Sequence, residues 1–115
     1  MVKVQKIDYD EENDILYLSN GEKVKDSLQI ENFVIDFSSE NKIVAIEILD
    51  ASKILSRLSQ LNIVPASLSK IESAAINIYQ GRELMYILLS MRMPVENISV
   101  DVRIPVPAPA AVSAR

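Results

Sequence analysis

Three carboxylates interrupt or follow apolar segments, and they are the residues most suited to chemistry. Asp36 lies within FVIDF, Glu47 lies within IVAIEIL, and Asp50 follows that segment directly. Carboxylates on neighbouring strands can hold Mg²⁺ for phosphodiester hydrolysis. Such nucleases pair an Asp with Glu-x-Lys, but Leu49 stands where the lysine should be. The structural alternative is that Asp36 meets solvent or a lysine, Glu47 an edge or a partner, and Asp50 caps a helix.

A second group of carboxylates lies in DYDEEND, residues 8–14. Calcium takes six to eight oxygen ligands, often from one flexible loop. An EF-hand that began at Asp8 would place Asn13 where the loop needs glycine, and Ser19 where it needs a bidentate glutamate. The run therefore predicts the exposed tip of a hairpin rather than a calcium site.

Cysteine and histidine are both absent from the 115 residues. Their absence removes disulfides, thiolate nucleophiles, Cys/His zinc sites and every catalytic pair that uses histidine. Only carboxylates, hydroxyls, lysine and arginine remain for chemistry. We expect no cofactor and favour a non-enzymatic role, and an enzyme built on the carboxylates stays open as the alternative.

The distribution of charge bears on the partner and on the compartment. The net charge is −4, with seven Lys and Arg against twelve Asp and Glu in residues 1–60, and five against four in residues 61–115. Neither half offers the dense basic patch that binding a phosphate backbone needs. Apolar runs fall short of the roughly 20 residues of a membrane span, and the start lacks the apolar core of a signal peptide. We expect a cytoplasmic protein that binds neither nucleic acid nor membrane.

The first half reads as β-hairpins. Residues 3–9 and 14–19 favour strands around the polar DEEN loop, and Asn20-Gly21 favours a type I′ turn into residues 22–29. Residues 33–37 and 43–49 are rich in β-branched and aromatic side chains, which predicts a further hairpin.

In that hairpin we expect Phe37 to pair with Ile43. Because side chains alternate along a strand, this register would place Asp36 and Glu47 on opposite faces. One face would carry Phe33, Ile35, Phe37, Ile43, Ala45 and Glu47, and the other Val34, Asp36, Val44, Ile46 and Ile48.

Two short helices should follow. Asp50 can cap a helix whose apolar positions, Ile54, Leu55, Leu58 and Leu61, recur at helical spacing. Pro65 suits the first turn of a second helix, which we expect to run through Leu68 and Ile71.

The pattern then returns to strands, and predicts a three-stranded meander. Residues 74–80 and 97–106 favour strands, whereas residues 82–93 fit either a helix or a strand. Their flanking Gly81 and Pro94 favour the strand. One face of that strand would be an unbroken apolar strip of Met85, Ile87, Leu89, Met91 and Met93. The strip is either core or an interface with a partner.

We therefore expect one α+β domain at residues 1–104 that is mainly antiparallel β. Residues 1–60 would form the five-strand unit with a helix, and residues 61–104 the short helix and the meander. Prolines at every second position from Pro105 should end strand pairing, so residues 105–115 are expected to form a flexible tail.

The first half resembles a prokaryotic family catalogued as domain of unknown function 2283. The similarity lies in KIDYDEENDILYLS and FVIDFSSENKIVAIEILDASKIL, and covers about residues 6–58. The resemblance implies a short β-rich unit that ends in a helix, but no activity, cofactor or catalytic residue.

We expect an interaction module that is a homo-oligomer or binds a protein partner. The alternatives are a divalent-metal hydrolase at Asp36, Glu47 and Asp50, and a small-ligand binder between two sheets.

Overall fold

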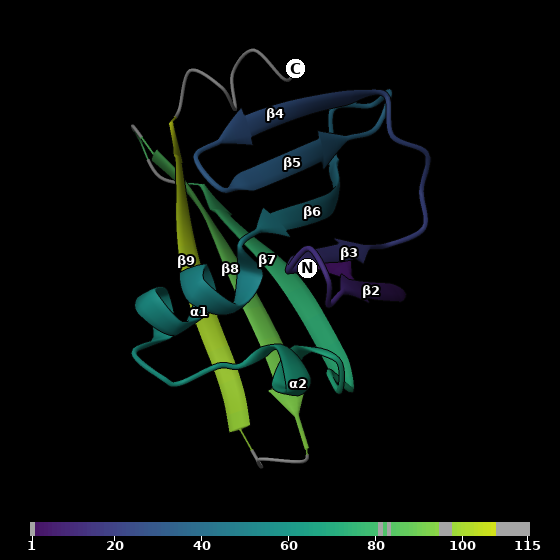
Figure 1. Ribbon diagram of the computed structural model, residues 1–115. Helices are drawn as coiled ribbons and strands as arrows, with labels where there is room; N and C mark the ends of the chain where they lie inside the picture. Colours follow the sequence, from purple (N-terminus) through teal and green to yellow (C-terminus); the bar gives the residue numbers. More distant parts are fainter. Residues whose placement is uncertain (1, 81, 83, 95–97, 108–115) are drawn as a thin grey trace.

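Two antiparallel sheets and two short helices form within residues 2–80, 82, 84–94 and 98–107, which the computed structural model describes (Figure 1). This confirms the α+β class. No helix in these residues is long and apolar enough to cross a membrane.

The five-stranded sheet has the order β2-β3-β6-β5-β4. Its strands are β2 (Lys6–Asp10), β3 (Ile15–Ser19), β4 (Asp26–Ile30), β5 (Phe33–Phe37) and β6 (Ile43–Leu49). Most residues of β6 are buried on both faces, whereas polar residues of β4 are exposed. An apolar strand suits the centre of a sheet and a polar one suits its edge.

This order shows that the predicted hairpin at Asn20-Gly21 is wrong. β3 pairs with β2 and β6, and residues 20–25 cross to the far edge of the sheet. The Asn20 side chain instead accepts a hydrogen bond from the Glu22 N–H at 2.9 Å, which closes an Asx turn, and Gly21 has a φ of 88°. The dipeptide does form a turn, but the apolar β6 takes the place beside β3.

A β-bulge between β5 and β6 changes the predicted faces. Phe37 pairs with Ile43 as expected, but Asp36 pairs with Ala45, so Val44 is an extra residue. A shift of one residue moves every later side chain of the strand to the other face. Asp36 and Glu47 therefore share the outer face, and their predicted separation is wrong.

The four-stranded sheet has the order β1-β7-β8-β9. Its strands are β1 (Val2–Lys3), β7 (Ser73–Gln80), β8 (Leu84–Met93) and β9 (Ile98–Pro107), so the ambiguous segment is a strand and the meander is confirmed.

Two boundaries at the chain ends differ from the expected ones. The predicted strand at residues 3–9 is split, and its two parts lie in different sheets. β9 continues past residue 104 through Pro105 to Pro107, which is possible because proline is tolerated on an edge strand. The rest of the predicted tail, residues 108–115, lies outside the described residues.

Apolar side chains from the inner faces of both sheets fill one core. The fully buried ones include Leu16, Leu18, Ile35, Ile46 and Ile48 from the five-stranded sheet, and Ile76, Ile87, Leu89, Met93, Val100, Val102 and Ile104 from the four-stranded sheet.

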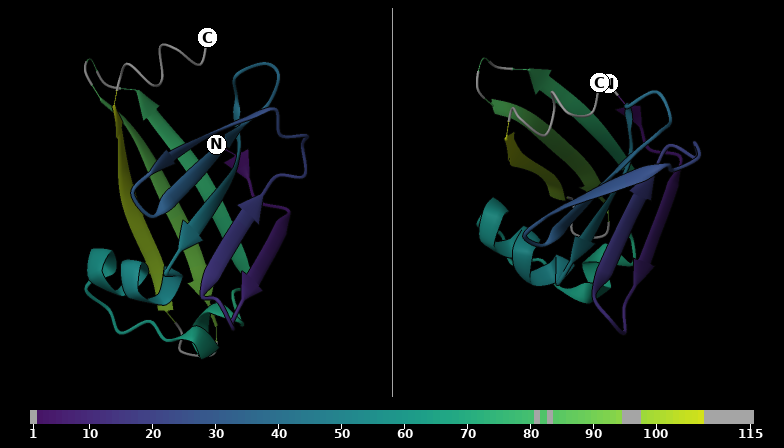
Figure 2. Two further views of the ribbon diagram at one scale, coloured as in Figure 1. Left: turned by 45° about the horizontal axis from the view of Figure 1, so that its top comes forward. Right: turned by 90° about the horizontal axis from the view of Figure 1, so that it is seen from above.

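The helices α1 (Ala51–Ser59) and α2 (Pro65–Leu68) lie near one end of the two sheets, and α1 packs against β9 (Figure 2). Ile54 and Leu55 are buried as predicted, but Leu58 is 42% exposed and Leu61 is 40% exposed. The expected stripe is too long: Leu61 lies beyond Ser59, where α1 ends, and Leu58 lies in the last turn of α1 on its exposed side.

Candidate functional site

The three predicted carboxylates do not converge. Asp36 is buried and accepts a hydrogen bond from the Ser27 hydroxyl at 2.6 Å. Glu47 is half-buried on the neighbouring strand β6, two residues after Ala45, which pairs with Asp36. It lies between Tyr17 on β3 and Val34 on β5. Across the described part of the chain, no three acidic side chains gather where they could hold a metal ion.

Asp50 occupies the N-cap position of α1, but its side chain does not cap the helix as predicted. Its backbone is left-handed, with φ of 52°, and its side chain makes no capping hydrogen bond. The cap comes from Asp14, which lies 38 residues before Ser52 in the sequence. Its carboxylate accepts hydrogen bonds from the Ser52 N–H at 3.0 Å and from the Ser52 hydroxyl at 2.7 Å. The Asp14 carbonyl also accepts from the Ala51 N–H at 2.9 Å. The β2–β3 hairpin tip thereby satisfies the free donors of the first helical turn.

Tyr9 completes this group, which we call the Asp14 clasp (Tyr9, Asp14 and Ser52). The Tyr9 hydroxyl donates to Asp14 at 2.6 Å. Burial alone would raise the pKa of Asp14, but the hydrogen bonds from Tyr9 and Ser52 outweigh it and hold that pKa below its usual value. Burial raises the pKa of Tyr9, and the bond to Asp14 raises it further. Since a weakly basic carboxylate and a protonated phenol make poor general bases, the clasp is structural.

The apolar strip of β8 lies in the core. Met85, Ile87, Leu89, Met91 and Met93 all point between the sheets and are at most 5% exposed. Because the five-stranded sheet covers this strip, it cannot contact a partner in the folded chain. Of the two interpretations of the strip, the core is therefore correct and the interface is wrong.

The opposite face of the same sheet is uncovered among the described residues, and we call it the open face. None of its side chains is buried, and Tyr79 is 56% exposed. By strand register, the open face carries Lys3, Ser73, Ala75, Asn77, Tyr79, Tyr86, Leu88, Ser90, Arg92, Ser99, Asp101, Arg103 and Pro105.

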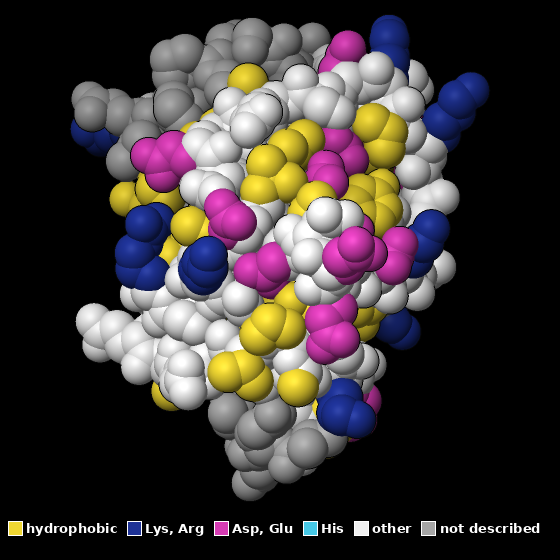
Figure 3. Space-filling view, in the orientation of Figure 1, with side chains coloured by type: hydrophobic (Ala, Val, Ile, Leu, Met, Phe, Trp, Pro, Cys, Tyr) yellow, Lys and Arg dark blue, Asp and Glu magenta, His cyan; other side chains and the backbone are white. Residues whose placement is uncertain are grey.

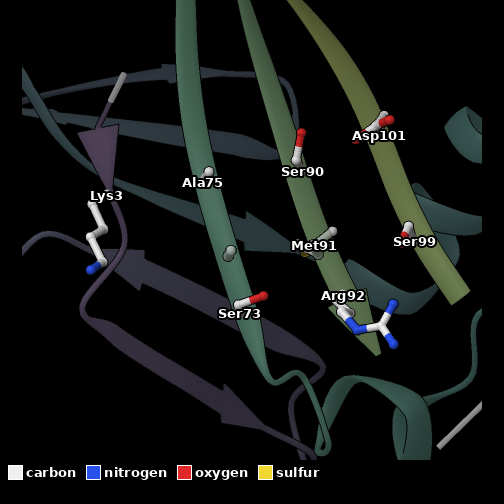
Figure 4. A pocket seen from close by; sticks show the side chains of 9 residues that line it. Lys3, Ser73, Ala75, Ser90, Met91, Arg92, Ser99 and Asp101 are labelled. Carbon is white, nitrogen blue, oxygen red and sulfur yellow. The ribbon is translucent and has the colours of Figure 1, made fainter. Parts of the chain in front are cut away.

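Small and large side chains are segregated on the open face. At one end Ser73, Ala75, Ser90 and Ser99 line a shallow hollow of about 520 Å³, with Lys3, Arg92 and Asp101 also lining it (Figure 4). At the other end Tyr79, Tyr86, Leu88 and Arg103 border a smaller hollow of about 290 Å³. The Arg103 guanidinium lies 5.5 Å from the centre of the Tyr86 ring, a cation–π contact.

The two outer faces also differ in charge. The open face carries three cations, Lys3, Arg92 and Arg103, and one carboxylate, Asp101. The outer face of the five-stranded sheet carries the reverse, with Lys6 among Asp8, Asp10, Asp36 and Glu47 by strand register. Figure 3 shows carboxylates and apolar side chains intermingled over β4, β5 and β6.

Comparison with known proteins now adds to this geometry. Residues 6–52 match the family model described as protein of unknown function DUF2283. A Methanosarcina mazei protein, provisionally named hypoxanthine phosphoribosyltransferase, is 30% identical over 99 residues, which cover 85% of this chain and 76% of that protein. Residues 6–52 belong to the DUF2283 family. An uncharacterized Methanocaldococcus jannaschii protein is 48% identical over 50 residues, 43% of each chain, so the match spans less than half of that relative. No solved structure matches.

The matched DUF2283 segment contains the whole Asp14 clasp and ends at Ser52. The open face lies entirely outside that segment. Sequence reasoning missed the open face because the methionine-rich strip drew attention to the other side of β8. Side chains alternate along β8, so the same pattern that puts the methionines on one face puts Tyr86 and Leu88 on the other. The sequence therefore contained the signal for this surface.

Proposed function

We propose that this protein is a non-enzymatic interaction module that self-associates through the open face. The observation that carries the proposal is an uncovered four-stranded face with exposed Tyr79 and part-buried Tyr86 and Leu88 beside Arg103. Tyrosine and arginine are enriched among the residues that contribute most to protein–protein binding. Covering an exposed cluster of apolar and aromatic side chains removes it from water, which favours association.

Sedimentation velocity over a wide range of protein concentrations tests the proposal. The wild type should shift towards a larger species as its concentration rises, and the double variant Tyr79→Ser/Tyr86→Ser should remain a monomer. Tyr17→Ser is the matched control, since it removes the same side chain from the outer face of the other sheet. Circular dichroism checks that each variant is folded. A wild type that is monomeric at every concentration would overturn the proposal, and so would association that survives in the double variant.

A second candidate comes from the provisional name of the Methanosarcina mazei relative. Lys3, Arg92 and three serine hydroxyls line the larger hollow, and cations with hydroxyl donors suit a phosphate group. Under this candidate the hollow would hold a phosphoribosyl donor. Calorimetric titration with that donor, and an assay of hypoxanthine consumption, test it. Absence of both saturable heat and turnover would remove it.

A further inference from the structure

The open face is complementary to itself under a two-fold rotation. We infer that the self-association proposed above is a symmetric dimer with the open faces of two copies packed together. The inference rests on the proposed function, and it adds the identity of the occupant and the residue pairs in contact. In such a dimer every contact occurs twice.

Strand register divides the open face into four rows across β7, β8 and β9. The first row is Ser73, Arg92 and Ser99, the second is Ala75, Ser90 and Asp101, the third is Asn77, Leu88 and Arg103, and the fourth is Tyr79, Tyr86 and Pro105. Apart from Arg92, the first two rows carry small side chains or Asp101, whereas Leu88, Arg103, Tyr79 and Tyr86 all lie in the last two.

The proposed two-fold axis runs parallel to the hydrogen bonds of the sheet, between the second and third rows. A rotation about this axis reverses the order of the rows but keeps each strand opposite its own copy. The first row then meets the partner's fourth row, and the second meets its third. The strands remain nearly antiparallel, as in aligned packing of two sheets.

This arrangement matches side chains by size. Ser73 lies opposite Tyr79 of the partner subunit, and Ser90 lies opposite Leu88 of the partner subunit. On β9 Ser99 lies opposite Pro105 of the partner subunit. Small residues facing large ones let two packed sheets interdigitate without voids.

The arrangement also matches charges. Asp101 lies opposite Arg103 of the partner subunit, where a carboxylate and a guanidinium can pair. Arg92 lies opposite Tyr86 of the partner subunit, where a cation can lie over an aromatic ring. Two pairs of each kind would form.

Other placements of the axis lack this match. An axis parallel to the strands would keep each row opposite the same row, so Asp101 could not meet Arg103. Placed along β8, it would also set Arg92 against its own copy and Tyr86 against its own copy. An axis along the third row would oppose the two copies of Arg103, and one along the second row the two copies of Asp101. Juxtaposed like charges disfavour association, so charge selects the axis between these rows.

The size of the face predicts a weak dimer. β7 has 8 residues, and β8 and β9 have 10 each. With a rise of about 3.4 Å per residue and strands about 4.8 Å apart, they would cover roughly 460 Å² per copy. Burying roughly 900 Å² in total is near the lower limit for a specific interface. Dissociation should therefore be measurable at ordinary protein concentrations.

Charge reversal tests the geometry. Asp101→Arg and Arg103→Asp each place like charges at both pairs, so each variant alone should dimerise at least about tenfold more weakly. Mixed together they should associate, because each copy then supplies the charge that the other needs. Sedimentation velocity of the two variants, separately and mixed, measures this. Lys6→Asp and Asp8→Arg are the control pair, since they change charge on the other sheet and should leave association unchanged.

Each outcome separates this inference from the proposed function. If the wild type associates but neither charge reversal weakens it, the two-fold geometry is wrong and self-association stands. If both variants weaken but their mixture does not recover, the pairing of Asp101 with Arg103 is wrong. A wild type that never associates removes the proposed function itself.

Discussion

Replacing Asp14 should separate α1 from the β2–β3 hairpin and destabilise the whole chain. The Asp14 carboxylate accepts hydrogen bonds from Tyr9 and Ser52, and its left-handed backbone has a φ of 55°. Asp14→Ala removes both interactions and also places an alanine in a conformation that it rarely adopts. Asp14→Asn keeps the side-chain shape and tolerates the same backbone, so it removes mainly the charge.

The size of the loss follows from these contacts. A helix cap contributes about 1 kcal/mol, and a hydrogen bond to a charged group about 1.5 to 3 kcal/mol. Because Asp14 is only part-buried, we use the lower end of that range and add about 1 kcal/mol for the alanine backbone. Asp14→Ala should therefore lower the free energy of unfolding by about 3.5 kcal/mol. Asp14→Asn should cost about half of that.

Urea denaturation followed by circular dichroism measures the free energy of unfolding at several pH values. Asp10→Asn is the matched control, because it removes a carboxylate from the same hairpin and should change stability little. The folded-state pKa of Asp14 is lowered, so its ionisation stabilises the fold above the unfolded pKa of about 3.9 and that contribution is lost as the pH falls through the folded pKa. The difference between wild type and Asp14→Asn should therefore shrink in acid.

The reasoning fails if Asp14→Ala unfolds at the same urea concentration as Asp10→Asn. It fails equally if the difference between wild type and Asp14→Asn stays constant from neutral pH into acid. Either result would mean that the hydrogen bonds of the clasp contribute nothing to stability.

Two further predictions concern the other polar contacts of the five-stranded sheet. The pKa of Tyr9 is raised in the folded chain, so its contribution to stability is present below the unfolded pKa of about 10. That contribution is lost as the pH rises towards the folded pKa. Above about pH 10 the wild type should therefore lose stability more steeply than Tyr9→Phe. Parallel slopes in alkaline urea titrations would contradict this. Ser27→Ala leaves the buried Asp36 without its donor and should lower the free energy of unfolding by about 1 to 3 kcal/mol, whereas Ser99→Ala on the open face should not. Equal midpoints for the two serine variants would argue against that hydrogen bond.

Local patterns predicted the elements well where one face of a strand is buried. Residues 82–93 fit either a helix or a strand by themselves. Gly81 and Pro94 beside them, with alternating segments on both sides, favoured the strand that became β8, although leucine and methionine favour helix. The pairing of Phe37 with Ile43 was also predicted, because the short polar loop between them leaves little choice of register.

The failures arise from interactions between distant residues. Asn20-Gly21 predicts a turn but not which strand pairs with β3. That strand is β6, which begins more than 20 residues later and whose side chains are mostly buried. The bulge at Val44 leaves no trace in the pattern, because Val44 and Ala45 are both apolar and either could face inward. The cap of α1 was assigned to Asp50 by proximity, although Asp14 reaches it only after the sheet has formed.

The candidate surface needed both alternation and register. Alternation alone shows that Tyr86 and Leu88 lie on the side of β8 away from the methionines. Which side chains stand next to them on β7 and β9 depends on the pairing, and only that pairing places Arg103 next to Leu88 and Asp101 next to Ser90. A self-complementary surface therefore could not be inferred from the sequence.

The pairing of β1 with β7 has a consequence for the order of events on the ribosome. Val2 and Lys3 are synthesised well before their partners Ile76 and Ala75, which emerge more than 70 residues later. The five-stranded sheet and the Asp14 clasp need nothing beyond Ser52, so they can form while the rest of the chain is still being made. The four-stranded sheet completes last. A nascent chain would therefore have no open face to offer a neighbour, but the apolar inner face of its five-stranded sheet would stay uncovered until the four-stranded sheet forms.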